Sequence, residues 1–139
     1  RGRAGLAANR RDLARLLWTL WSPKWAFDDA TFEATAKSFD NPDFVDVVIQ
    51  SYRHRYGYAE GDPAYADIEK MLEAQPPIAV PTISLHGDAD GVSPVASSEG
   101  HKKHFTGPYQ RRIVPLAGHN VPQENPKAFA EAVIELCRG

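Results

Sequence analysis

The amino-acid sequence predicts an α/β fold in which helices come first and the sheet comes late. Apolar residues recur at helical spacing through residues 1–77, and no strand-like run interrupts them. After Pro81 the pattern changes, and two short apolar runs alternate with helical segments through residues 78–139. Two strands are too few for a parallel sheet that is covered on both faces. We therefore expect further strands of this sheet to come from outside the 139 residues.

The composition is that of an ordinary globular domain. The 139 residues are 42% hydrophobic, and 16 basic against 18 acidic side chains leave a net charge of −2. This balance gives no electrostatic reason to expect nucleic acid or a membrane as partner, and no apolar run reaches the roughly 18 residues of a membrane span. The single cysteine, Cys137, cannot form an internal disulfide, which favours a cytoplasmic location. Because the chain begins at Arg1 and not at Met, we expect the natural N-terminus to lie upstream.

The first two predicted helices are defined by leucine and phenylalanine spacing. One helix ends at Ser22-Pro23, because a residue before proline disfavours the helical conformation. Its apolar face comprises Leu6, Leu13, Leu16, Leu17 and Leu20. The second helix begins at Asp28 or Asp29, either of which can cap it, and carries Phe32, Ala36 and Phe39 as its apolar stripe.

Two further helices complete the helical half. Asn41-Pro42-Asp43 combines a capping residue, a proline suited to the first helical turn and an acid near the positive end of the dipole, and predicts a helix that continues to about Arg55. Asp62-Pro63 starts the fourth helix, which ends at Gln75-Pro76-Pro77. We expect its apolar residues to face inward: Tyr65, Ile68 and Leu72.

The second half reads as strand, helix, strand, helix. The first strand is predicted at residues 81–85, and Ser93-Pro94 starts a helix that reaches about residue 104. The second strand is predicted at residues 112–116, and Asn125-Pro126 starts the last helix. On that helix we expect three residues to face inward, Phe129, Val133 and Leu136, with Cys137 buried and inert beside them.

Each predicted strand ends in a glycine-containing loop that carries titratable side chains. Functional groups collect at the carboxyl ends of strands in open α/β sheets, so we expect these two loops to face each other. His119, after the second strand, is the candidate general base, although a histidine in a surface loop is the simpler reading of that residue alone. Asp90 and Asp88, after the first strand, are the candidates for the acid that orients the imidazole. A metal bound by His86, Asp88 and Asp90 is disfavoured, because these residues do not make a complete ligand set.

The two loops together resemble those of the α/β hydrolases. In that family a late apolar strand runs into Gly-x-x-Asp, which matches Gly87 to Asp90, and a later loop carries the catalytic histidine, which matches Ala117-Gly118-His119. The resemblance covers residues 80–139 in the expected order, acid before histidine, and selects Asp90 over Asp88. The latter then becomes a turn residue that bonds its own backbone. Residues 1–77 resemble the family's helical cap, and residues 78–139 the last two β–α units of its sheet.

One segment of the helical half resembles a narrower branch. Ser51-Tyr52-Arg53 is similar to the Tyr-Arg of epoxide hydrolases and dehalogenases, which implies that Tyr52 donates a hydrogen bond to the substrate, with Tyr56 as the alternative. Tyr52 can equally be the last member of an apolar stripe that packs the cap. The sequence also contains three tryptophans, Trp18, Trp21 and Trp25. We expect most of them to pack the cap helices together; the alternative is that they line an apolar substrate pocket.

The family's nucleophile elbow and oxyanion loop have no match in this chain. The resemblance thus implies a hydrolase whose nucleophile lies in an upstream part of the same fold, with His119 as base and Asp90 as its partner. An epoxide is the first substrate class it suggests, a carboxylic ester with a serine nucleophile the second, and a halogenated compound the third. A non-catalytic binding module on the same scaffold is the alternative of another class. The triad needs only water, so no cofactor is implied; a homodimer is compatible with the sequence.

Overall fold

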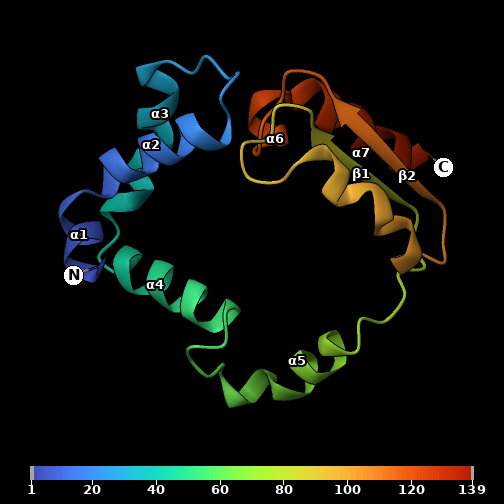
Figure 1. The fold of residues 1–139 in the computed structure, drawn as a ribbon, viewed down its shortest axis with the longest axis horizontal. Helices are drawn as coiled ribbons and strands as arrows, with labels where there is room; N and C mark the ends of the chain where they lie inside the picture. The colour runs from blue at the N-terminus through green and yellow to red at the C-terminus, as the bar shows by residue number, and fades with distance from the viewer. Residues whose placement is uncertain (1, 139) are drawn as a thin grey trace. The chain divides into compact units, whose positions relative to one another are not determined.

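A computed structural model describes residues 2–138, which divide into two compact units (Figure 1). The first unit comprises the residues up to Leu16 together with Phe27–Ala74 and is helical. The second comprises Leu17–Ala26 and the residues from Gln75 onward, and contains the sheet. A short stretch from early in the chain therefore packs with the strand-bearing half. Within the described residues, no helix is long and apolar enough to cross a membrane.

The helices of the first unit follow the predicted order. Their bounds are α1 (Gly2–Ala8), α2 (Arg10–Trp21, which continues into the second unit), α3 (Asp29–Ala36), the 3₁₀ helix η1 (Lys37–Asp40), α4 (Phe44–Arg55), the 3₁₀ helix η2 (Pro63–Tyr65) and α5 (Ala66–Glu73). The first predicted helix is two helices, interrupted at Asn9, whose side chain donates to the carbonyl oxygen of Gly5 at 3.0 Å. Helix α2 ends just before Ser22-Pro23, as predicted.

The start signals of the next helices act in different ways. Asp28 caps α3 by accepting the backbone N–H of Thr31 at 2.7 Å, and hydrogen bonds from the Thr31 side chain and backbone hold the pKa of Asp28 below its usual range. Asn41 was expected to cap α4, and this was wrong. Its side-chain oxygen accepts the N–H of Asp43 at 2.9 Å, which closes a local turn, so the helix begins only at Phe44.

Aromatic side chains dominate the small core of the first unit. Phe32 and Ala36 on α3 are fully buried, and Val45 on α4 is buried. Adjacent phenylalanine rings lie 5.1 to 6.4 Å apart between centroids in the series Phe27, Phe32, Phe39 and Phe44.

Helix α5 does not fit the sequence expectation. Tyr65, Ile68 and Leu72 were expected to face inward, but their exposed fractions are 58%, 51% and 56%. Helix α5 buries none of its residues within the first unit. The apolar stripe is therefore present in the sequence, but the first unit does not cover it.

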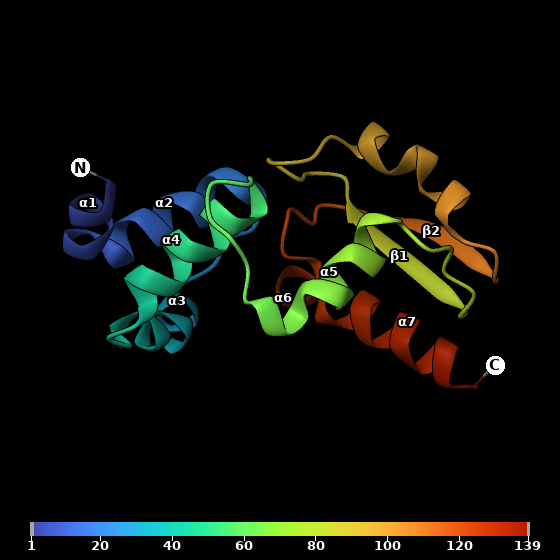
Figure 2. The same ribbon diagram turned by 90° about the horizontal axis from the view of Figure 1, so that it is seen from below.

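Two parallel strands form the sheet of the second unit. Strand β1 (Thr82–Gly87) pairs in register with β2 (Tyr109–Val114), which starts three residues earlier than predicted because Tyr109 pairs with Thr82. The connection is the 3₁₀ helix η3 (Val95–His104) where an ordinary helix was expected. Helices α6 (Val121–Glu124) and α7 (Pro126–Arg138) follow β2. In Figure 2, α7 lies along one face of the two strands and η3 along the other.

The core of the second unit is also small. Val114, Ala117 and Val121 are buried together, with Leu85 and Ala128 packed against them. On α7 the buried residue is Ala132, and the three residues expected to face inward, Phe129, Val133 and Leu136, keep exposed fractions of 44%, 44% and 40%. Cys137 is exposed and not buried as expected. At 3.6 residues per turn it points about 140° away from Ala132. Apolar faces left open on this scale fit a chain that forms only part of a sheet fold.

Candidate active site

The two loops predicted to meet do meet at the carboxyl edge of the sheet. Gly87, the last residue of β1, is paired with Val114, the last residue of β2. The register continues past the strands, because the N–H of Asp88 donates to the Val114 carbonyl at 3.1 Å and that of Ala89 to the Ala117 carbonyl at 2.9 Å. Gly87 permits this approach: a Cβ at that position would lie 2.2 Å from the carbonyl oxygen of Ala117.

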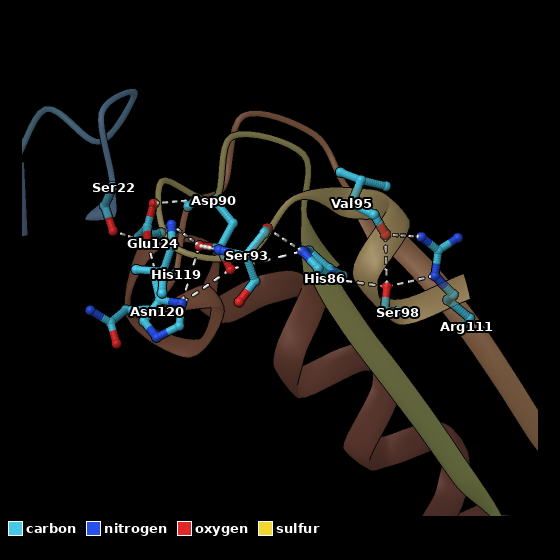
Figure 3. A network of polar contacts seen from close by, with 12 residues as sticks. Ser22, His86, Asp90, Ser93, Val95, Ser98, Arg111, His119, Asn120 and Glu124 are labelled. Atoms are coloured by element: carbon cyan, nitrogen blue, oxygen red, sulfur yellow. Dashed lines mark hydrogen bonds and ion pairs between the residues drawn. The ribbon is translucent and has the colours of Figure 1, made fainter. Parts of the chain in front are cut away.

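Asp90 and His119 form the pair that the sequence predicted (Figure 3). Both carboxylate oxygens of Asp90 lie 3.1 Å from Nδ1 of His119. The Asp90 side chain is 8% exposed, whereas that of His119 is 37% exposed. The carboxylate is thus shielded behind an imidazole that remains accessible. With Nδ1 facing Asp90, proton transfer to or from a reactant falls to Nε2.

Asp90 is held as an anion by its own turn. Burial by itself raises the pKa of this carboxyl, but hydrogen bonds from the backbone N–H groups of Ser93 and Val92, and then His119, outweigh it and keep the pKa below its usual range. The two backbone bonds are short, at 2.7 Å from Val92 and 3.0 Å from Ser93, and both end on Oδ1. A carboxylate fixed in this way stays ionised at neutral pH.

Asp88, the other candidate acid, joins the two loops. Its Oδ1 accepts the N–H of Leu116 at 2.6 Å, so it ties the first loop to the second. Leu116 has a φ of 60°, a left-handed conformation that is unusual for a branched side chain. The expectation that Asp88 bonds its own backbone was therefore wrong, since its partner is 28 residues away.

Behind Asp90 lies a second histidine whose role was not predicted. His86 is buried, and its Nε2 donates to the carbonyl of Ser93 at 3.0 Å, while Nδ1 lies 2.8 Å from the hydroxyl of Ser98. Arg111 donates to the same hydroxyl at 2.8 Å. His86 thereby supports the turn that holds Asp90. Among the described residues no group of three His, Cys, Asp or Glu side chains is placed to bind a metal.

Trp21 contacts both loops from the end of α2. Its carbonyl oxygen accepts the N–H of Gly91 at 2.9 Å and the N–H of His119 at 3.1 Å. Its ring meets the imidazole edge-on, with centroids 5.5 Å apart. Trp18 is buried and stacks on Trp25, with ring centroids 5.1 Å apart. A role for the tryptophans in lining a substrate pocket stays a prediction.

Glu124 is the second residue that sequence reasoning missed. Its carboxylate accepts three hydrogen bonds, from the hydroxyl of Ser22 and from the backbone N–H groups of Gly118 and Asn120 (Figure 3). The two N–H groups flank His119. The only sequence signal was the position of Glu124 in the segment Pro122–Pro126 that follows the histidine loop, which specifies no partner.

The predicted substrate-binding tyrosines belong to the first unit. Tyr52 lies near the end of α4 and Tyr56 is the residue that follows the helix, and their rings stack with centroids 6.4 Å apart. Their exposed fractions are 47% and 63%. A role for either residue in binding stays a prediction.

Comparison with solved structures places this geometry in a family. No protein-family model and no curated protein sequence matches the chain. A crystal structure of a putative epoxide hydrolase from Klebsiella pneumoniae matches 100% of this chain at 46% identity, with a TM-score of 0.92. The matched part is 46% of that protein's chain.

Two more distant structures share the fold. Cfl2 from Burkholderia cenocepacia matches 96% of this chain with a TM-score of 0.67 and 20% identity. CarC, a serine hydrolase involved in carbazole degradation, matches 92% with a TM-score of 0.60 and 22% identity. This chain spans 42% and 47% of those chains, so it covers less than half the length of each structure it resembles. The paired loops, the strand order and the match over the whole of this chain together show that the chain belongs to the α/β hydrolase superfamily and forms part of that fold.

Proposed function

We propose that the protein containing this chain hydrolyses epoxides, with His119 as general base and Asp90 as the anion that orients it. The observation that carries the proposal is the approach of both Asp90 oxygens to Nδ1 of His119 at 3.1 Å. The 46% identity to a putative epoxide hydrolase supports the choice of substrate class. A small apolar epoxide and water are the reactants, and the reaction requires no cofactor. The single cysteine favours the cytoplasm as the compartment.

The proposed reaction has two steps, formation of an ester to the enzyme and hydrolysis of that ester with His119 as base. A carboxylate nucleophile supplied by another part of the fold attacks one epoxide carbon, the carbon–oxygen bond breaks, and an ester to the enzyme forms while the alkoxide takes up a proton. His119 then accepts a proton from water through Nε2, and the resulting hydroxide attacks the ester carbonyl. The ester carbon–oxygen bond then breaks, and the departing alkoxide takes the proton from the His119 imidazolium. The carboxylic acid that remains returns a proton to the group that protonated the first alkoxide, so the products are a diol and the regenerated carboxylate. Asp90 stabilises the imidazolium that exists between these proton transfers.

Turnover by the full-length protein and its His119→Ala variant tests this proposal. A panel of a terminal epoxide, an aryl ester and a haloalkane separates the three substrate classes. We expect diol formation from the epoxide, and a fall in kcat by a factor of at least about 10³ in the variant, with an unchanged circular dichroism spectrum. Equal turnover by the two proteins would exclude His119 as the base. Hydrolysis of the ester alone would indicate a serine nucleophile, and binding without turnover would indicate a binding module.

A further inference from the structure

We propose that Glu124 is a positioning residue for His119: its carboxylate fixes the histidine loop on both sides of the imidazole. This inference rests on the proposed function, in which His119 moves a proton. Glu124 does not touch the imidazole itself. It acts through the backbone that carries it.

The first step is the number of hydrogen bonds. Oε2 accepts the N–H of Gly118 at 2.6 Å, and Oε1 accepts the N–H of Asn120 at 2.8 Å. These residues immediately precede and follow His119. Oε1 also accepts the hydroxyl of Ser22 at 2.6 Å, and Ser22 is almost fully buried, with 1% exposure. Bonds from donors to an ionised carboxylate are stronger than those between neutral groups.

The second step is that the donors come from two segments that are far apart in the chain. Ser22 lies 102 residues before Glu124, directly after α2, whereas Gly118 and Asn120 belong to the loop between β2 and α6. Glu124 itself is the last residue of α6. The backbone N–H of Glu124 donates to the carbonyl oxygen of Asn120 at 3.0 Å. The carboxylate of Glu124 therefore joins the histidine loop to the buried Ser22.

The third step is that the histidine loop packs closely against the segment that follows α2. A Cβ on Gly118 would lie 2.5 Å from the Cα of Ser22, so the histidine loop and the segment after α2 are in direct backbone contact. The N–H of His119 is itself bonded to the carbonyl of Trp21 at 3.1 Å. The backbone N–H groups of Gly118, His119 and Asn120 are thus all hydrogen-bonded. The Glu124 carboxylate accepts the first and the last of them.

The three donors around position 124 require a carboxylate there, and an uncharged polar side chain does not replace it. Glutamine has one acceptor oxygen and one NH₂ group, so whichever way its amide is turned, an NH₂ faces a donor that must then lose its bond. Either the N–H of Gly118 or the N–H of Asn120 is left without an acceptor, whereas the Ser22 hydroxyl can accept from the NH₂ group. We expect the loop of Glu124→Gln to shift, and a shift of about 1 Å in a catalytic group lowers rates by about 100-fold.

The test compares Glu124→Gln with Glu131→Gln in the full-length protein. Glu131 lies on α7 and pairs at 3.8 Å with Lys127 on the surface, which makes it a matched control. We expect Glu124→Gln to lower kcat by between about 10- and 100-fold with KM nearly unchanged. The low-field proton resonance of His119 Nδ1–H should broaden, and the amides of Gly118 and Asn120 should exchange faster with solvent. Glu131→Gln should change none of these.

Measurement of His119→Ala alongside keeps the two proposals apart. If His119→Ala is inactive and Glu124→Gln keeps wild-type kcat, resonance and exchange rates, the positioning role is wrong while the proposed function stands. If His119→Ala retains activity, the proposed function fails. Should Glu124→Gln not fold, Glu124→Asp keeps the carboxylate but withdraws it by one methylene. Wild-type kcat together with a wild-type Nδ1–H resonance in that variant would overturn the positioning role.

Discussion

Asp90 reaches His119 with both carboxylate oxygens at 3.1 Å from Nδ1, from a side chain that is 8% exposed. The pair bridges two loops that are 29 residues apart in the chain and that follow neighbouring parallel strands. The same carboxylate is bonded by the N–H groups of Val92 and Ser93, so its position is fixed before any substrate arrives.

Removal of the negative charge at this position should abolish the orientation of the imidazole. Asp90→Asn presents an NH₂ or a neutral oxygen to Nδ1, which favours the wrong tautomer, and we expect kcat to fall by about 10⁴-fold. Asp88→Asn is the matched control, because Asp88 bonds Leu116 and its loss should lower stability by about 1 kcal/mol with kcat affected little. Steady-state kinetics and thermal unfolding on both variants measure this. Equal losses of kcat would contradict the assignment of Asp90 over Asp88.

The stability of the protein should fall at acid pH in a way that depends on Asp90. The folded-state pKa of Asp90 lies below its usual range, whereas the unfolded-state value is about 3.9. A depressed pKa contributes stability that is fully present above the unfolded value and is lost as pH falls through the folded value. The free energy of unfolding should therefore decrease below about pH 4. Urea unfolding at several pH values measures this decrease, which should be shallower in Asp90→Asn than in the wild-type protein. An identical dependence of the unfolding free energy on pH in the two proteins would contradict the assignment of the effect to Asp90.

Because the two loops are in close contact at Gly87, a larger residue at this position should destabilise the protein. An alanine Cβ there meets the backbone carbonyls of Ala117 and Gly118 at 2.2 and 2.4 Å, and backbone atoms cannot yield without moving the loops apart. We expect Gly87→Ala to lose between about 1 and 3 kcal/mol of stability and to lower kcat. Gly100→Ala is the control, because nothing lies within 4 Å of its added Cβ. Urea unfolding compares the two, and similar losses would contradict the described approach.

Tyr52 on α4 and Tyr56, which follows that helix, give a test of the epoxide chemistry. Similarity of Ser51-Tyr52-Arg53 to the Tyr-Arg of epoxide hydrolases predicts that the Tyr52 hydroxyl donates to the epoxide oxygen as the ring opens. Loss of such a proton donor in Tyr52→Phe should cost a factor of about 10² or more in kcat. Tyr56→Phe, one turn away in a ring that stacks on Tyr52, should cost little. Kinetics on an epoxide substrate decide the matter, and the reverse order would assign the donor to Tyr56.

The sequence was informative where structure is local or follows strand direction. The strand pattern predicted that the two loops meet, because parallel strands bring their following loops to one edge, and the resemblance to the Gly-x-x-Asp pattern selected Asp90 over Asp88. Asn41 misled because two local hydrogen-bonding patterns compete for it, a helix cap and a turn. Glu124 could not be assigned, since its partners come from positions 22, 118 and 120 and are brought together only by the fold.

The exposed apolar faces show a different limit. Periodicity correctly placed Phe129, Val133 and Leu136 on one side of the last helix, but burial depends on the surface opposite. Where the unit that carries an apolar stripe supplies no such surface, the stripe remains open within that unit, as it does on α5. Sequence pattern therefore predicts which face is apolar and not whether it is covered.

Intact-mass spectrometry of the full-length His119→Gln variant, mixed with a terminal epoxide, tests the central claim most directly. Attack of an ionised carboxylate on the epoxide does not require His119, whereas hydrolysis of the resulting ester does. We predict that the variant gains the mass of one substrate molecule and that the wild-type protein does not accumulate this adduct. An unmodified variant that still produces diol at the wild-type rate would contradict the account.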